Sequence, residues 1–587
     1  EARAPPSRAE ELLAGAAKAE AETFPEASSW PEALAALCSA AGCPAPSCSD
    51  PRAVSSASLR AALGWLLRTG LQQAAGMEEP RTRLLRGGAL VVGGLAQEAE
   101  HAAQIQDLLE GYFAEQQQKG SNTSQMTEMN GFIDAALFGG LARHLGAEHP
   151  KFSAIRLRLV RRLQKPTTSP AAQSAIADAL VPLLEADPSA VEELSRGFLE
   201  GLRAPQEPVR RAAALGVAAA VRAAGGAGAL KRLGVMDFVR DAVAAEGKSA
   251  SAQRQGGCLC LEALAARLGR TFEPYAHATM PLLLASCSDS AKEVRTAGQA
   301  AAETVIAQVS GNGLKLMVNP LLDGLEDKRW RTQLSAIELL QPIVAQLVAA
   351  APKRLAAVLP RAVPALCEAA AGARADVRAA ARGVLEQVGA AVSHPDVAKL
   401  TPSLIRALAE PNDATLGKAL ESLLGAVYTT SLTGAACALI CPVVQRALMR
   451  GDASARQKAA GFARTLASIA EGSEEDTAPY LAALRAPLEA LLADPTPSVR
   501  EAAARAVGVL AGAAPGGAQG ADLADGLLER LDGARDESEL EGAAQGLAAA
   551  VTSVSDERRE ELLAELLSPP APPTARLGRL TALAHLP

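Results

Sequence analysis

A stripe of cations between residues 151 and 177 is where the side-chain types and spacing of this 587-residue sequence most clearly suggest chemistry. The window holds six lysines and arginines and no acidic residue. On a helix through residues 155–165, four of these cations share one face at i, i+3, i+4 and i+7, namely Arg158, Arg161, Arg162 and Lys165. Such a face can bind phosphate groups or an acidic partner. An ordinary solvated helix face has the same pattern, so both interpretations stay open.

A second candidate surface combines two cations with a rare aromatic residue, at Lys328, Arg329 and Trp330. The chain has only three tryptophans, and a tryptophan beside cations can act as an anchor for a partner. The alternative for Trp330 is a core position between two neighbouring repeats. The sequence alone leaves both possibilities open.

Motifs for catalysis and cofactor binding are incomplete in this sequence. Residues 245–249 resemble the end of a phosphate-binding loop that would place Lys248 on a phosphate, but Ala242 stands where the loop needs its first glycine. No G-x-S-x-G or H-E-x-x-H motif is present, and the six histidines are scattered. Nine cysteines without zinc-finger spacing indicate reduced, mostly buried thiols. We therefore predict no catalytic residue, no metal site, no cofactor and no enzyme activity.

The elements that position these residues follow an internal repeat. A turn followed by Val-Arg and a run of small residues recurs clearly at 208–213, 293–297, 376–380 and 498–503. Weaker copies extend the series from residue 86 to residue 541, with a mean spacing of about 41 residues. This period is typical of HEAT and armadillo repeats. We predict a right-handed all-α solenoid of about twelve helical hairpins. Its arginine ladder would pair the following residues with acids of neighbouring repeats: Arg295, Arg331, Arg378 and Arg500.

The composition favours the same fold class. Hydrophobic residues form 49% of the chain, which excludes a disordered chain, and aromatic residues form only 3%. The sequence relies on alanine and leucine, which favour helices over sheets. The net charge is −7, so contact with a polyanion must come from a local patch. No segment is apolar and uncharged for long enough to predict a membrane span.

The periodicity divides the chain into four predicted segments. Residues 1–80 keep the period poorly, residues 81–250 and 251–551 hold HEAT repeats, and residues 552–587 form a helix and a proline-rich tail. Pro360 and Pro442 are expected to mark turns between helices, as is the stretch 513–517. Because the first residue is Glu1 rather than methionine, we expect a fragment or an incomplete gene model.

Several phrases in a fixed order resemble one family of proteins. They include Phe272-Glu273-Pro274-Tyr275, Trp330-Arg331-Thr332, Ile440-Cys441-Pro442 and the run from Asp494 to Arg500. From about residue 80 to 551 they resemble the central HEAT region of the general control nonderepressible one translational activator. That region, from residue 251 onwards here, is similar to the HEAT region of fungal elongation factor three. One departure is Arg254-Gln255-Gly256, which lacks the acid that the family carries after the arginine.

The resemblance implies a non-enzymatic, cytoplasmic scaffold that binds ribosomes. It also implies activation of the kinase that phosphorylates initiation factor two alpha during amino-acid starvation, and an ABC-type partner protein. The family's kinase-binding segment lies C-terminal to the matched region, and no membrane association is expected. The ribosome or another polyanion would then be the partner of Arg158, Arg161, Arg162, Lys165, Lys328, Arg329 and Trp330.

Two other classes of HEAT protein remain as alternatives. A TOG-type array binds tubulin through basic and aromatic residues at successive turns within its repeats, and here only Lys328-Arg329-Trp330 has that composition. A transport receptor or phosphatase scaffold would bind peptides along its concave face.

Overall fold

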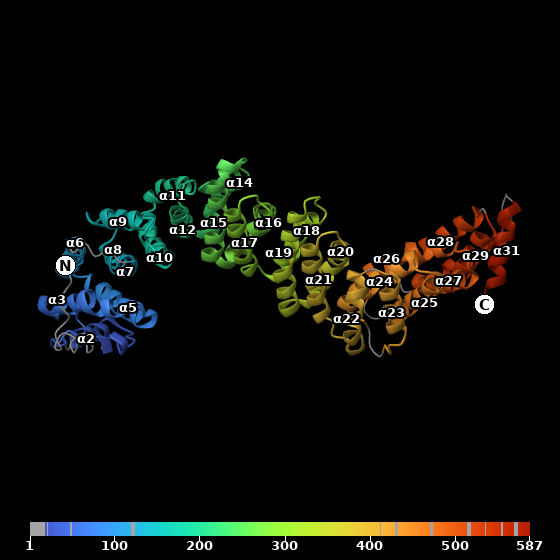
Figure 1. The fold of residues 1–587 in the computed structure, drawn as a ribbon, viewed down its shortest axis with the longest axis horizontal. Helices are drawn as coiled ribbons and strands as arrows, with labels where there is room; N and C mark the ends of the chain where they lie inside the picture. The colour runs from blue at the N-terminus through green and yellow to red at the C-terminus, as the bar shows by residue number, and fades with distance from the viewer. Residues whose placement is uncertain are drawn as a thin grey trace. The chain divides into compact units, whose positions relative to one another are not determined.

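The computed structural model describes residues 18–19, 21–46, 50–118, 124–410, 412–428, 432–469, 474–512, 518–534, 536–552, 556–568 and 573–586. Within these ranges every regular element is helical, and no β-strand occurs. The all-α prediction is therefore confirmed. The chain separates into two compact units, residues 1–308 and 309–587 (Figure 1).

The first unit is built from short and medium helices joined by tight turns. Their bounds are α2 (Trp30–Ala40), η1 (Pro51–Ala53), α3 (Ser56–Trp65), η2 (Leu66–Gly70), α4 (Leu71–Gln73), α5 (Glu78–Leu95), α6 (Ala99–Gln118), α7 (Ser124–Ile133), η3 (Asp134–Phe138), α8 (Gly139–Leu145), α9 (Phe152–Gln164), α10 (Pro170–Ala186), α11 (Ser189–Gly201), α12 (Glu207–Ala223), η4 (Gly226–Gly228), α13 (Ala229–Arg232), α14 (Val235–Val243), η5 (Lys248–Ala250), α15 (Ser251–Leu268), η6 (Gly269–Phe272), α16 (Glu273–Cys287) and α17 (Lys292–Ala307).

From α9 onwards the helices of this unit form hairpins, in which α9, α11, α14 and α16 are the first helices and α10, α12, α15 and α17 the second. Each second helix packs on the second helix of the next hairpin. Side chains at matching positions of three successive second helices therefore meet on one surface.

The second unit repeats the hairpin with fewer interruptions. Its helices are α18 (Gly311–Leu325), α19 (Trp330–Ala350), α20 (Pro352–Ala370), α21 (Ala375–Ala390), α22 (Pro395–Ala409), α23 (Asp413–Leu424), α24 (Gly434–Arg450), α25 (Ala453–Ile469), α26 (Glu474–Leu491), α27 (Pro497–Gly512), α28 (Ala518–Asp532), α29 (Glu537–Val551), α30 (Asp556–Leu567) and α31 (Pro573–His585). Even-numbered helices from α18 pack against the odd-numbered helix that follows.

The recurring Val-Arg phrase marks the start of second helices, as the period predicts. The clear copies lie at the first turns of α12, α17, α21 and α27. Val294, Val377 and Val499 are buried there, and the arginine that follows each lies beside the preceding turn. A buried valine next to a turn-binding arginine is a local reason for the chain to reverse every 40 residues or so.

The prediction that Pro360 and Pro442 mark turns is wrong. Pro360 lies inside α20 and Pro442 inside α24, and other first helices carry internal prolines at Pro281, Pro320 and Pro402. An internal proline removes one backbone hydrogen bond and favours a bend. The repeated position shows that first helices accept this cost, because burial of their apolar face stabilises them.

Some sequence predictions concern the ends and loops. The loop predicted at 513–517 lies outside the described residues, as do residues 569–572 of the proline-rich stretch 568–573. Two helices, α30 and α31, lie in the segment 552–587, and α31 packs on α29 with Ala582 buried. The four-segment division of the chain stays a prediction.

By length and composition alone, α19 could cross a membrane. It is a core helix in this fold, because it packs against α18, α20 and α21 and buries nine of its residues. It also carries Arg331 and Glu338, which are exposed.

Candidate functional site

The cationic stripe lies on α9, with the apolar face buried as predicted. Ile155, Leu159, Val160 and Leu163 are buried against neighbouring helices. The opposite face lines a concavity of about 480 Å³ whose other walls come from α6 and η3. All four predicted cations line it, together with Gln106, Glu110, Phe113, Asp134 and Phe138.

Two of the four cations are bound by a buried carboxylate. Asp134 has no exposed side-chain surface, and it accepts hydrogen bonds from Arg158 Nε at 2.8 Å and Arg162 Nε at 2.6 Å. Removing a carboxylate from water costs free energy unless cations and hydrogen bonds replace the lost hydration. Arg158 and Arg162 therefore have a structural role, which is to compensate the buried charge of Asp134.

Aromatic rings fix the position of Arg158 further. Its guanidinium carbon lies 4.2 Å from the centre of the Phe113 ring and 4.3 Å from that of Phe138. Both distances allow cation–π attraction. Phe138 and Asp134 are the ends of η3, a single π-helical turn that aims both side chains at α9.

Arg161 and Lys165 are the free members of the stripe. Both side chains are exposed, and among the described residues no carboxylate lies within ion-pair distance of either. The other acid on the rim, Glu110, accepts a hydrogen bond from Gln106 at 2.5 Å. The concavity thus carries four cations and two acids, and its uncompensated positive charge is on Arg161 and Lys165.

The second predicted surface is a turn in the other unit. Lys328 and Arg329 are exposed, and Arg329 is bound to Asp327 at 3.0 Å. Trp330 is partly exposed rather than a buried core residue, and the guanidinium carbons of Arg331 and Arg374 lie 5.1 and 4.3 Å from its ring centre. The turn is therefore a cation–aromatic surface.

The predicted arginine ladder is present in part. Arg295 and Arg378 each donate two hydrogen bonds, of 2.7–3.1 Å, to carbonyl oxygens five and six residues earlier. Arg500 makes the same two bonds and also pairs with Glu541 of the next repeat. Arg331 makes no such bond in the described part of the chain, because its guanidinium lies over Trp330. Inter-repeat pairing is thus seen for Arg500, whereas the bonds of Arg295 and Arg378 stay within their own turns.

The family departure at Gln255 also has a structural counterpart. Gln255 is buried and accepts a hydrogen bond from Arg210 of the preceding repeat, as Glu541 does from Arg500. A neutral amide replaces the carboxylate at the same point of the ladder.

Residues 245–249 form the turn between α14 and α15 rather than a phosphate cradle. The carbonyl oxygens of Ala245 and Gly247 point at Arg254, which donates to them at 2.9 and 2.8 Å. Arg254 also binds Asp289 of the next repeat. Among the described residues, no group of histidine, cysteine, aspartate or glutamate side chains is placed to hold a metal ion.

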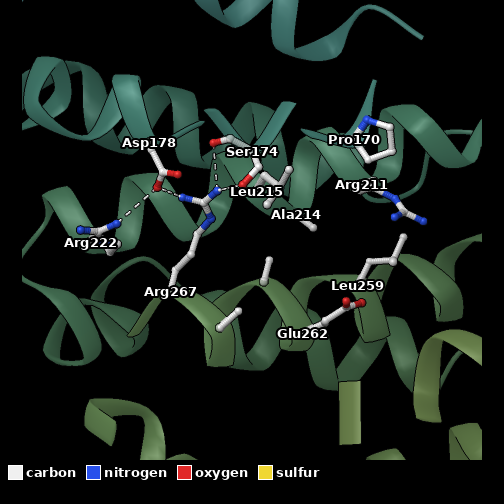
Figure 2. Close-up of a pocket in the computed structure, with 12 residues that line it drawn as sticks. Pro170, Ser174, Asp178, Arg211, Ala214, Leu215, Arg222, Leu259, Glu262 and Arg267 are labelled. Carbon is white, nitrogen blue, oxygen red and sulfur yellow. Dashed lines mark hydrogen bonds and ion pairs between the residues drawn. The ribbon is translucent and has the colours of Figure 1, made fainter. Parts of the chain in front are cut away.

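A second concavity, of about 510 Å³, spans α10, α12 and α15 (Figure 2). Its floor is apolar and includes Leu215, Leu259 and Ala263. At one end, Arg267 reaches from α15 past α12 to α10, where it pairs with Asp178 and donates to the carbonyl and hydroxyl oxygens of Ser174, each at 3.0 Å. This end of the concavity is closed by charged side chains.

Sequence reasoning did not find Asp134 or the second concavity. Asp134 is a lone carboxylate in the apolar run 131–138, and such a residue signals a buried charge that needs a partner. Three residues of the second concavity, Asp178, Arg222 and Arg267, are spaced 44 and 45 residues apart. These spacings are close to the repeat period and place one of the residues on each of three successive second helices, with Arg222 and Arg267 in the last turns of α12 and α15 and Asp178 in the middle of α10.

Comparison with known proteins agrees with this architecture. Residues 210–385 match a family model described as EF3 N-terminal HEAT repeat, and residues 415–520 match one described as Elongation factor 3/GNC1 HEAT repeat. Over 437 residues, 74% of this chain, the sequence is 32% identical to the Stalled ribosome sensor GCN1 of Homo sapiens. The chain is a HEAT region of the GCN1 family.

Other relatives of this GCN1-family region carry different names. It is 31% identical over 436 residues to Protein ILITYHIA of Arabidopsis thaliana, and 31% identical over 432 residues to the eIF-2-alpha kinase activator GCN1 of Dictyostelium discoideum. These matches cover 73% of the chain. They cover only 16% of each relative, so the chain spans about a sixth of their length.

Proposed function

We propose that this GCN1-family region is a non-enzymatic scaffold that binds ribosomes in translational control. The names of its relatives, a stalled ribosome sensor and an activator of the eIF-2-alpha kinase, support this role. The observation that carries it is the positive charge of Arg161 and Lys165, which have no ion-pair partner among the described residues and lie beside the Arg158 and Arg162 pairs with Asp134. Ribosomal RNA offers phosphates to such a rim. A protein that binds ribosomes in this way would act in the cytoplasm.

Within this proposal the four cations of the stripe, three on α9 and Lys165 at its C-terminal cap, have different tasks. Arg161 and Lys165 contact phosphate, whereas Arg158 and Arg162 hold the helix in place through Asp134. The cation–aromatic turn with Lys328, an exposed cation, is a second proposed contact. An ABC-type protein and the eIF-2-alpha kinase are further proposed partners, the latter through a segment beyond the matched region.

The test is cosedimentation of the purified chain with ribosomes over a range of salt concentrations. The double variant Arg161→Glu, Lys165→Glu should reduce binding and lower the salt dependence by about 1.4–1.8 in the logarithmic slope, since two phosphate contacts are lost. The matched control is Arg196→Glu, Lys231→Glu, which reverses two exposed cations of the same unit away from α9. Unchanged cosedimentation and slope in the first variant would refute the role of α9.

A further inference from the structure

The concavity on α10, α12 and α15 contains an acid whose charge is not matched by a neighbour. Glu262 points from α15 into it, and in the described part of the chain no cation lies within ion-pair distance of its carboxylate (Figure 2). Arg211 is the cation whose charge acts on the Glu262 carboxylate, but its guanidinium donates a hydrogen bond to Glu207 at 2.7 Å. Burial raises the pKa of Glu262, and Arg211 only partly opposes that effect.

The other charges of the concavity are already engaged. Arg267 is almost fully buried and pairs with Asp178, and Arg222 lies 3.5 Å from the same carboxylate oxygen. The rest of the lining around Glu262 is apolar or small and includes Ala214, Leu215, Leu259, Ala263 and Ala266. A concavity of about 510 Å³ that has an apolar floor with a carboxylate beside it suits a long aliphatic chain that ends in a cation.

We propose that this concavity binds a lysine or arginine side chain of a partner polypeptide. The methylene groups would lie on the apolar floor and the cation would pair with Glu262, which recovers the hydration that the carboxylate lost. Because the site spans three second helices, it can also accommodate an extended peptide segment that crosses successive repeats. The inference is independent of the ribosome proposal, because it uses other helices and the opposite charge.

A protein partner is favoured over a nucleic acid by the charges themselves. Phosphate groups would meet Glu262 and the half-exposed Asp178, and both would repel them. Arg211 and Arg222 are each turned towards a carboxylate, Glu207 and Asp178, rather than left free for an anion.

The probe is an acetylated, amidated pentapeptide, Ala-Leu-Lys-Leu-Ala, titrated against the purified chain by saturation-transfer NMR, with norleucine and glutamate versions in place of lysine. The lysine peptide should bind about fivefold more tightly than the norleucine peptide, as expected for one partly exposed ion pair. Glu262→Gln should abolish that preference. Glu193→Gln, an exposed acid outside the concavity, should leave it unchanged.

A second variant guards against an effect on folding. Ala266 is exposed on the wall of the concavity, so Ala266→Leu narrows the site without crowding the core, and it should weaken all three peptides while Glu262 is intact. Equal binding of the lysine and norleucine peptides to the unaltered chain would overturn the proposal. Tighter binding of the glutamate peptide would also overturn it and assign the site to acidic partners.

Discussion

The ion pairs of Asp134 allow a quantitative test of whether Arg158 and Arg162 belong to the fold. Asp134→Asn keeps the size of the side chain but removes the charge that faces two guanidinium groups. Breaking a buried ion pair by removing one partner typically costs about 3–5 kcal/mol. Arg158 keeps a third of its side chain in contact with water, which lowers the loss, so we expect about 3 kcal/mol.

The loss should appear locally, because repeat proteins open in segments rather than all at once. Hydrogen exchange measured by mass spectrometry is therefore the assay, on the peptides that cover α7 to α10. A loss of about 3 kcal/mol corresponds to roughly a hundredfold faster exchange where opening limits it. Peptides from the second unit serve as an internal reference.

The control variant is Arg161→Gln, which removes an exposed cation from the same helix and should change exchange by less than about threefold. Exchange in Asp134→Asn that stays within that same range would refute the reasoning. Arg158 and Arg162 would then be held too weakly by Asp134 to count as structural, and all four cations would be available to a ligand.

Three further outcomes follow from the packing and the burial of single residues. Gly542→Ala should lower the melting temperature measured by circular dichroism, because the added Cβ would lie 1.7 Å from the Leu492 carbonyl oxygen, whereas Gly461→Ala meets nothing within 4 Å and should raise it slightly. Glu262→Gln should raise the melting temperature at pH 7 and have a smaller effect near pH 4. The folded pKa of this carboxyl is raised, so its contribution to stability is present below the unfolded pKa and is lost as the pH rises through the folded one. Burial raises the pKa of Cys260 to about 12, so iodoacetamide at pH 7.5 should alkylate this thiol only after denaturation, as read by peptide mass spectrometry.

The sequence predicted the repeated architecture because the repeat itself is local. A buried valine and a turn-binding arginine recur near the start of second helices, so the period could be read without knowing any contact. Pro360 was misplaced for the opposite reason. A proline is read locally as a helix breaker, but tertiary burial of α20 outweighs the one backbone hydrogen bond that it removes.

The sequence predicted that the four cations of the candidate site share one face, but not which of them are paired within the fold and which are free. Spacing along α9 put four cations on one face, and the structure brings all four to one concavity. Which of them are free depends on Asp134, 24 residues before Arg158, and a helical period carries no information about that contact. The Glu262 site is harder still to predict from the sequence, because its walls come from three different hairpins.

The bond that Arg267 makes across two helix interfaces has a mechanical consequence. Where only neighbouring repeats are in contact, a solenoid can straighten by small changes at each interface between repeats, and each interface deforms independently of the others. Between α10 and α15 the same motion must also lengthen the contacts of Arg267 with Asp178 and Ser174. This stretch should therefore resist bending more than its neighbours. Asp178 is half exposed, and dissolved ions weaken such a link, so its stiffness should decrease as ionic strength rises.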